Sequence, residues 1–322
     1  MCEGGVLKNL SFFIYGGFMD ILITGGAGFI GSNLALHLQK MADNITIVDD
    51  FSKGVYKNLE GFEGDVVVAD ISKENMDWEH YLDFEPDYIF HEASNTDTTY
   101  PDDKEMLRSN IEGFRNVLEF AINSQAKVIY ASSAGVYGKG IIPMSENSQR
   151  EPKNAYAFSK YILENMAKKY VENYDLECVG LRYFNVYGPR ESFKGKAASM
   201  IYQLALQMRE LKRPRIFEFG EQFRDQIYIK DLVEANIRAM EAPSGVYNVG
   251  TGKPTSFNKI VEVLNKVLGT SLEPDYIKNP YTQFYQDQTL ADVSLAASKM
   301  GFVAKYDIEA GIEDYMRWLG FA

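Results

Sequence analysis

From Met19 onward, short runs of apolar residues alternate with longer stretches in which apolar and polar positions follow a helical period. Short apolar runs predict buried strands, and the amphipathic stretches between them predict helices. This alternation is typical of a parallel sheet with helices on both faces. We therefore expect an α/β protein with a Rossmann-type, doubly wound parallel sheet. The predicted strands are residues 20–25, 44–50, 65–70, 87–93, 126–133 and 177–188, and the predicted helices are 31–41, 104–124 and 155–173.

The regular alternation ends after Gly188, and the last third of the chain predicts a smaller, mostly helical lobe. We expect residues 19–187 to form a dinucleotide-binding domain, to which segments near 226–255 return, and residues 188–322 to form a substrate-binding lobe. The first 18 residues are expected to be a disordered extension. The elements predicted in the lobe are a helix at 197–211, short strands at 215–220 and 245–250, and helices at 228–241 and from Ser256 onward.

The composition and net charge of the chain argue against several classes of binding partner. The 322-residue chain has a formal net charge of -12, which argues against binding to nucleic acid or to an anionic membrane surface, because both demand a basic face. The apolar stretch from Leu10 to Phe18 is too short to span a bilayer. Two cysteines and three scattered histidines form neither a disulfide framework nor a metal-type spacing. We expect a cytoplasmic protein without a metal site, whose bound phosphate is held locally.

The stretch "TGGAGFIGS" follows the first predicted strand and opens the first predicted helix. In this context Gly25 permits a tight turn, Gly28 lets the backbone approach a pyrophosphate, and Gly31 allows close packing of helix on strand. A glycine triplet alone is weak evidence, but here strand, turn and helix follow in the required order. We expect a nicotinamide dinucleotide, NAD(P), to contact these glycines together with Phe29 and Ile30.

Acidic residues after the next strands bear on which dinucleotide binds. Asp49 stands at the spacing expected for a ribose hydroxyl contact, and Asp49 with Asp50 would repel a 2'-phosphate, which favours NAD. Lys53 lies close enough in sequence to complicate this interpretation. Asp70 is a candidate to bind the adenine amino group beside Ile71, although a strand-end cap explains it nearly as well.

A second group of residues supplies proton chemistry. Tyr156 and Lys160 in "NAYAFSK" are four apart, so on a helix they share one face. Ser133 ends a predicted strand that would deliver its hydroxyl to the same crevice. A phenol is a weak base at neutral pH, but a nearby ammonium and a positive nicotinamide stabilise its phenolate. Such a tyrosine can remove a proton from an alcohol while a hydride leaves.

On these residues, from about Met19 to the C-terminus, the chain resembles the extended short-chain dehydrogenase/reductases that act on nucleotide sugars. The resemblance implies that Ser133, Tyr156 and Lys160 form the catalytic triad, that Lys160 also holds the nicotinamide ribose, and that Asn110 is the structural asparagine near the active site. It further implies a nucleotide diphosphate sugar as substrate and a homo-oligomer.

The stretches "RYFNVYGPRESFKGKAASM", "RIFEFGEQFRDQIYIKD" and "NPYTQFYQDQTLAD", with their spacing, are similar to the heptose 6-epimerases, which invert C6 of ADP-D-glycero-D-manno-heptose through a 6-keto intermediate. The resemblance implies that Lys194 is a second acid/base and that Arg224 contacts the diphosphate. Inverting a carbinol requires hydride removal from one face and return to the other, so one proton carrier per face suffices. These epimerases are generally associated with NADP, which leaves NAD and NADP both open.

Further substrate contacts are expected around the same crevice. Arg190 suits a bidentate phosphate contact because its guanidinium is planar, and Lys194 with Lys196 could alternatively serve only to neutralise phosphate. The polar stretch after the fourth predicted strand lies where strand ends form the crevice. The remaining candidates for substrate contact are Ser94, Asn95, Thr96, Ser133, Asn185 and Tyr285.

Two other functions remain as alternatives. A UDP-hexose 4-epimerase, or another nucleotide-sugar epimerase or dehydratase of the same family, would share the glycine turn and triad. A dehydratase is disfavoured because "SSAGVYG" lacks the Asp-Glu pair that follows the serine in those enzymes. A non-catalytic, cofactor-binding protein on the same fold is the alternative from a different class, although both Tyr156 and Lys160 are present.

Overall fold

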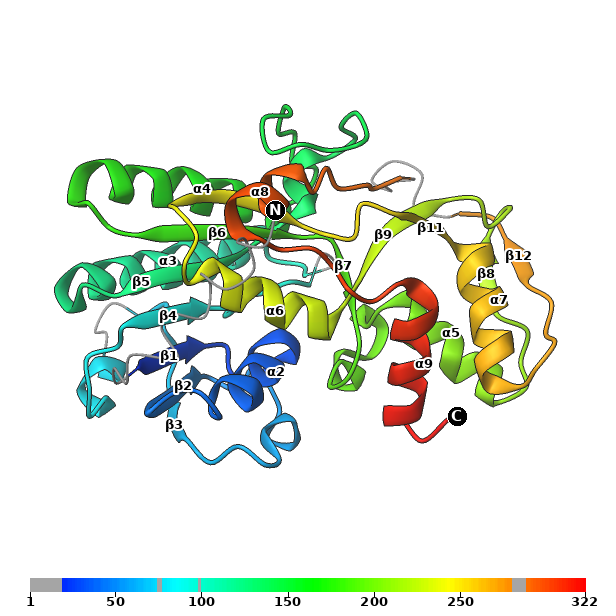
Figure 1. Ribbon diagram of the computed structural model, residues 1–322, viewed down its shortest axis with the longest axis horizontal. Coiled ribbons are helices and arrows are strands. Elements are labelled where there is room, and N and C mark those ends of the chain that lie inside the picture. Colours follow the sequence, from blue (N-terminus) through cyan, green and yellow to red (C-terminus); the bar gives the residue numbers. More distant parts are fainter. Residues whose placement is uncertain (1–18, 74–76, 98–99, 280–287) are drawn as a thin grey trace, which may run out of the picture.

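The computed structural model describes residues 19–73, 77–97, 100–279 and 288–322. Its centre is a seven-stranded sheet in the order β10-β6-β5-β4-β1-β2-β3 (Figure 1), and every neighbouring pair of strands is parallel. The Rossmann-type fold predicted from the alternation is thereby confirmed. The strands are β1 (Asp20–Thr24), β2 (Asn44–Asp49), β3 (Asp65–Val68), β4 (Tyr88–His91), β5 (Lys127–Ser133), β6 (Cys178–Tyr183) and β10 (Gly245–Val249).

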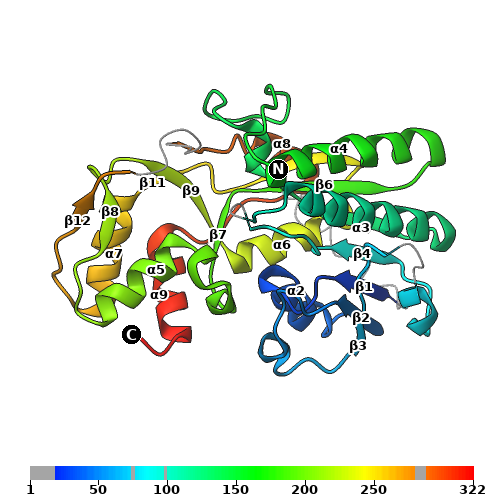
Figure 2. The same ribbon diagram turned by 180° about the vertical axis from the view of Figure 1, so that it is seen from behind.

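Helices cover both faces of this sheet. Side chains alternate along a strand, so Ile21 and Ile23 of β1 pack in one apolar core with Leu34, whereas Leu22 packs in another with Phe114. The first core is closed by α2 (Phe29–Leu38) and α6 (Ile229–Ala239), and the second by α3 (Asp103–Ser124) and α4 (Ala155–Tyr174). Figures 1 and 2 show these two helical layers on opposite sides of the sheet.

Most of the chain after β6 forms a smaller lobe beside the sheet, which lies at one end of the molecule in Figures 1 and 2. Two short sheets, β11-β9-β7 and β12-β8, pack there with three helices. α6 and β10 instead return to the main sheet. The lobe's elements are β7 (Asn185–Tyr187), α5 (Met200–Arg209), β8 (Arg215–Phe217), β9 (Phe223–Tyr228), β11 (Pro254–Ser256), α7 (Phe257–Leu268), β12 (Asp275–Ile277) and α9 (Ile308–Trp318). The short helix α8 (Ser294–Met300) packs beside β10 and α6 at the main sheet.

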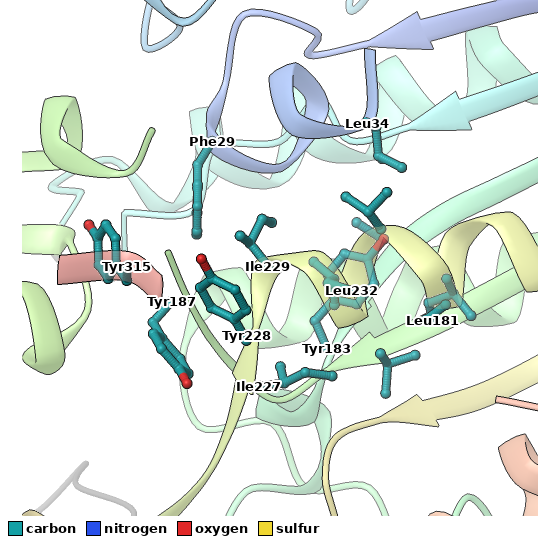
Figure 3. Close-up of a cluster of buried hydrophobic side chains, with 14 of the residues drawn as sticks. Phe29, Leu34, Leu181, Tyr183, Tyr187, Ile227, Tyr228, Ile229, Leu232 and Tyr315 are labelled. Atoms are coloured by element: carbon teal, nitrogen blue, oxygen red, sulfur yellow. The ribbon is translucent and has the colours of Figure 1, made fainter. Parts of the chain in front are cut away.

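The core of the lobe continues the core under α2. Figure 3 shows Phe29, at the start of α2, above a group of tyrosines that come from three elements of the lobe. The rings of Tyr187 and Tyr228 lie 5.3 Å apart between centroids, and Tyr315 of α9 is fully buried in the same cluster. Because apolar packing joins the lobe to the sheet, the lobe's side chains are held in fixed positions around the dinucleotide-binding turn.

Three predicted elements are wrong in their bounds. The predicted strand 177–188 is two strands, β6 and β7, which belong to different sheets. The residue between them, Phe184, is buried, so the apolar pattern does not show the break. The first helix begins at Phe29 and ends at Leu38 rather than spanning 31–41. The predicted helix 197–211 is a 3₁₀ segment over Ser192–Ala197 followed by α5.

Among the described residues, the model contains no helix long and apolar enough to cross a membrane.

Candidate active site

The glycine turn between β1 and α2 has the close backbone contacts that its sequence predicts. Gly25 has φ +72°, a conformation that favours glycine, and a Cβ at this position would collide with the backbone of Ala93 at the end of β4. A Cβ on Gly31 would collide with the carbonyl oxygen of Gly25. The turn therefore leads directly into the N-terminus of α2, whose first backbone N–H groups have no partner within the helix, which is an arrangement that binds phosphate.

A cavity of about 320 Å³ opens beside this turn. It runs along the carboxyl ends of the strands, where open α/β sheets bind ligands. Ser94 and Asn95, which we predicted as substrate contacts, lie here, on the dinucleotide side of the crevice. Phe29, Ile30 and Gly31 do not line it. The predicted site residues that line the cavity are Gly25, Gly28, Asp49, Asp50, Lys53, Asp70, Ile71, Ser94, Asn95 and Asn110.

Asp49 and Asp50, at the end of β2, make different contacts. The carboxylate of Asp49 accepts hydrogen bonds from the backbone N–H groups of Ala27 at 2.9 Å and Phe51 at 2.8 Å, so it fixes the glycine turn. Burial raises the pKa of Asp49. Asp50 accepts from Ser52 with one oxygen only, and its other oxygen accepts no hydrogen bond from the described part of the chain. Asp50 is therefore the carboxylate with an oxygen available for a ribose hydroxyl.

Ser133, Tyr156 and Lys160 come together where β5 ends and α4 begins. Asn154 caps α4 by accepting from the backbone N–H of Ala157 at 2.8 Å, which places Tyr156 in the first turn and Lys160 one turn later. The Lys160 ammonium nitrogen lies 5.9 Å from the centre of the Tyr156 ring. Burial raises the pKa of Tyr156, and a hydrogen bond with Ser133 opposes this.

Lys160 is almost completely buried, and its Nζ has no hydrogen-bond partner among the residues that the structure describes. Burial lowers the pKa of this lysine to about 8, with the negative charge of Glu92 acting in the opposite direction. A buried cation without a partner is costly unless a ligand completes its hydrogen bonds. The orphaned Nζ thus indicates that a polar ligand group binds against it.

Asn110 of α3 joins the two sides of the site. Its side chain accepts from the backbone N–H of Asn95 at 2.7 Å and donates to the Asn95 carbonyl at 3.1 Å. It also donates to the hydroxyl of Ser159 at 3.0 Å, and Ser159 in turn donates to the carbonyl of Tyr156. One amide therefore links the cavity wall to the helix that carries Tyr156 and Lys160.

Glu92 is a residue of the site that the sequence did not indicate. It follows β4, lines the dinucleotide cavity, and accepts a hydrogen bond from the Tyr183 hydroxyl at 2.7 Å. Burial raises the pKa of Glu92 to about 7, although Tyr183 and the charge of Lys160 both oppose the rise. Tyr183 is 91 positions away in the chain, so no local pattern could have revealed the pair.

A second cavity, of about 330 Å³, opens from the lobe. Lys194, Arg224 and Asn185 line it, as does Arg215, which we had not singled out. The amine of Lys194 lies 5.5 Å from the centre of the Phe29 ring, and Phe29 is the first residue of α2, next to the glycine turn. The second proton-carrier candidate therefore lies in a basic cavity beside the dinucleotide-binding turn.

Other predicted contacts lie elsewhere. The Arg190 Nε donates to the carbonyl of Asn58 at 3.1 Å, and its guanidinium lies over Trp318, so Arg190 lines neither cavity. Lys196 and Thr96 are exposed and line neither cavity, and Tyr285 lies outside the described residues. Within the described ranges, no group of three His, Cys, Asp or Glu side chains could hold a metal.

The residues present fit a nicotinamide dinucleotide. Gly25 and Gly28 of the turn line the cavity at the N-terminus of α2, which suits a pyrophosphate, and Asp50 has a free oxygen for a ribose. Two buried polar atoms of the site, Lys160 Nζ and Ser94 Oγ, have no partner among the described residues. A bound ribose with its hydroxyls supplies the acceptors and donors that both atoms lack.

Comparison with known proteins places this geometry in a family. Residues 21–250 match the family described as the NAD dependent epimerase/dehydratase family. An ADP-L-glycero-D-manno-heptose-6-epimerase of Brachyspira hyodysenteriae is 38% identical over 284 residues, which are 83% of this chain and 88% of the relative.

Two solved structures share the fold over nearly the whole chain. The ADP-L-glycero-D-manno-heptose-6-epimerase of Helicobacter pylori has a TM-score of 0.87 at 43% identity, covering 94% of this chain and 96% of that one. The UDP-glucose 4-epimerase of Thermotoga maritima, solved with UDP-glucose, has a TM-score of 0.87 at 30% identity, covering 94% and 99%. The glycine turn, the Tyr156–Lys160 pair and these matches agree: the chain belongs to the NAD-dependent epimerase/dehydratase family.

Proposed function

We propose that this protein inverts C6 of ADP-D-glycero-D-manno-heptose through a transient 6-keto intermediate. The observation that carries the proposal is the presence of two proton carriers beside one dinucleotide-binding turn: Tyr156 with Lys160 on α4, and Lys194 over Phe29 at the start of α2. The relatives named for this reaction, at 34–43% identity over most of the chain, support the same substrate.

The chain's own residues would handle the protons. When bound, the nicotinamide accepts the C6 hydride and returns it, so no cofactor is consumed. Tyr156, as a phenolate stabilised by the Lys160 ammonium, removes the C6 hydroxyl proton as the carbonyl forms. Ser133 holds the oxygen in line with Tyr156. For the reverse transfer, Lys194 would donate a proton to the C6 oxygen from the other face of the ketone, so that the inverted alcohol forms. The two carriers then re-equilibrate with solvent.

The lobe cavity supports a nucleotide diphosphate as the handle of the substrate. Arg215, Arg224 and Lys194 line it together, which gives a net acidic chain one local concentration of positive charge. Two guanidinium groups can each make a bidentate contact with phosphate oxygens. Phe257 adds an apolar wall to the same cavity, against which a nucleotide base can pack.

A UDP-hexose 4-epimerase is the second candidate, because a structure of that activity shares the fold. Incubation with ADP-D-glycero-D-manno-heptose, followed by NMR of the product, separates the two. We expect inversion at C6 and no net change in nicotinamide absorbance. Inversion at C4 of UDP-glucose, with the heptose unchanged, would reverse the assignment.

We propose NAD as the preferred dinucleotide, because Asp50 presents a free carboxylate oxygen at the cavity wall. A carboxylate there accepts from a ribose 2'-hydroxyl and repels a 2'-phosphate. We expect calorimetry to give a lower Kd for NAD than for NADP, and the Asp50→Asn variant to narrow the difference about tenfold or more. Tighter binding of NADP by the wild type would contradict this proposal and would mean that Lys53, in the same wall, decides the preference.

A further inference from the structure

The loop that carries Lys194 is closed at its base by one buried carboxylate. Glu191 is completely buried, and its Oε1 accepts from the backbone N–H of Gly188 at 3.1 Å and from the hydroxyl of Ser199 at 2.8 Å. Its Oε2 accepts from the backbone N–H of Ser199 at 2.6 Å. Gly188 and Ser199 are the two ends of the loop, so a single side chain ties the end of β7 to the N-cap of α5.

Between these anchors the loop has further contacts: Gln203 donates to the carbonyl of Gly195 at 2.6 Å, and Phe193 packs against the apolar core. Gly195 has φ +54°, and a Cβ there would contact nothing. The backbone N–H of Lys194 donates to the carbonyl of Glu191 at 3.0 Å, which sets Lys194 one turn beyond the carboxylate. Asn33 of α2 donates to the carbonyl of Pro189 at 3.0 Å. The base of the loop, where Glu191 holds both ends, is therefore one of the contacts that set the position of the Lys194 amine beside α2.

The negative charge of Glu191 also acts on that amine. Burial lowers the pKa of Lys194 and the charge of Glu191 opposes the fall. The other charged groups that line the same cavity, Arg215 and Arg224, are both cations. On the opposite side, Tyr315 of α9 faces the carboxylate, and burial with the Glu191 charge raises the pKa of that phenol, so Tyr315 stays neutral.

We propose that Glu191 is the positioning residue for Lys194: its carboxylate joins both ends of the loop that carries the amine. The inference rests on the proposed function, because Lys194 donates a proton there. A glutamine would not replace the carboxylate, since its amide NH₂ would face donors that need an acceptor and its neutral side chain would remove the negative charge that acts on Lys194.

The test measures the Lys194 titration directly in the full chain. Lysines are reductively methylated with ¹³C, and the Lys194 signal is assigned by its absence in Lys194→Met. We expect Lys194 to titrate at lower pH in Glu191→Gln than in the wild type, because an opposite charge has been removed. Glu210→Gln is the matched control. Glu210 is an exposed glutamate at the C-cap of α5 that pairs with Lys212, so its substitution should leave the Lys194 titration unchanged.

Kinetics separate positioning from simple structural support. In Glu191→Gln we expect kcat to fall about tenfold while KM changes by less than about twofold, as for loss of one transition-state proton donor. Ser199→Ala loosens the same anchor but keeps the charge, so it should not shift the Lys194 titration. An unshifted titration in Glu191→Gln, or an equal shift in Ser199→Ala, would overturn the proposal.

A fallback variant covers the case in which Glu191→Gln does not fold. Glu191→Asp keeps the negative charge but shortens the side chain, so kcat should fall while the Lys194 titration stays nearly unchanged. A wild-type kcat in Glu191→Asp would overturn the positioning role.

Failure of the proposed function would give a different result. A wild type that leaves C6 of the heptose unchanged would refute that function, while the NMR titration, which needs no substrate, would still report whether Glu191 controls Lys194.

Discussion

At the residue scale, the buried lysine of α4 sets the expected pH dependence. Burial lowers the pKa of Lys160 to about 8, and the ammonium is the form that stabilises the Tyr156 phenolate. Activity should therefore decline as the pH rises through about 8, because the ammonium loses its proton. A pH profile of kcat/KM measures this decline in the free enzyme.

Tyr156→Phe should lower kcat by about 10²-fold or more at every pH, since it removes the proton acceptor.

Lys168 is the control for this profile, because it lies on the same helix but is 73% exposed at its side chain and pairs with Glu172. Lys168→Met should keep the wild-type profile. A wild-type profile that stays flat up to pH 9.5 would mean that Lys160 keeps its proton in the folded enzyme, contrary to the effect of burial.

The residues with local signatures were found from sequence, and those with distant partners were not. The glycine turn and the Tyr156–Lys160 spacing each lie within a few consecutive positions, and Asn110 links the cavity beside the turn to the helix that carries the pair. Glu92 has the pattern of an ordinary acidic residue, because its partner Tyr183 is 91 positions away and only the fold brings the two together. Glu191 lies within eight positions of Ser199, but no local pattern predicts that its carboxylate is buried between the two ends of the loop. Arg190 was a reasonable phosphate candidate by chemistry, but its guanidinium contacts Asn58 and Trp318 instead.

At the scale of elements, Asn110 joins α3 to both the cavity wall and α4. Asn110→Ala would leave the backbone groups of Asn95 without two hydrogen bonds, and each buried unsatisfied group costs about 1–3 kcal/mol. We expect a lower Tm and a Kd for NAD raised about tenfold or more, measured by thermal unfolding and calorimetry. Asn123→Ala, an exposed position near the end of the same helix, should change neither.

An unchanged Kd for NAD in Asn110→Ala, with Tm lowered, would mean that the asparagine has a purely structural role.

The bounds of the helices and strands were only partly predictable from the sequence. Gly28 caps α2, but the stretch 177–188 is apolar on both sides of the break at Phe184, whose backbone N–H bonds to Val249 at 3.1 Å. A pattern of buried positions cannot show that the chain leaves one sheet and enters another.

At the scale of the whole molecule, the site is formed by segments that are far apart in the sequence. α6 packs beside α2 and β10 joins the sheet next to β6, although both follow the first part of the lobe (Figures 1 and 2). The shared core around Phe29, Tyr228 and Tyr315 (Figure 3) fixes the lobe against the glycine turn. The parallel sheet was predictable from alternation, but the approach of Lys194 to Phe29 depends on this long-range packing.

The most direct test of the central claim follows the hydrogen on C6. If Tyr156 and Lys194 serve one ketone whose hydride leaves to and returns from the same bound nicotinamide, substrate carrying deuterium at C6 should give inverted product that keeps the label. In D₂O, unlabelled substrate should gain no deuterium at C6. NMR of the product after many turnovers measures both. Loss of the label, or solvent deuterium at C6, would contradict the claim and indicate proton abstraction from carbon.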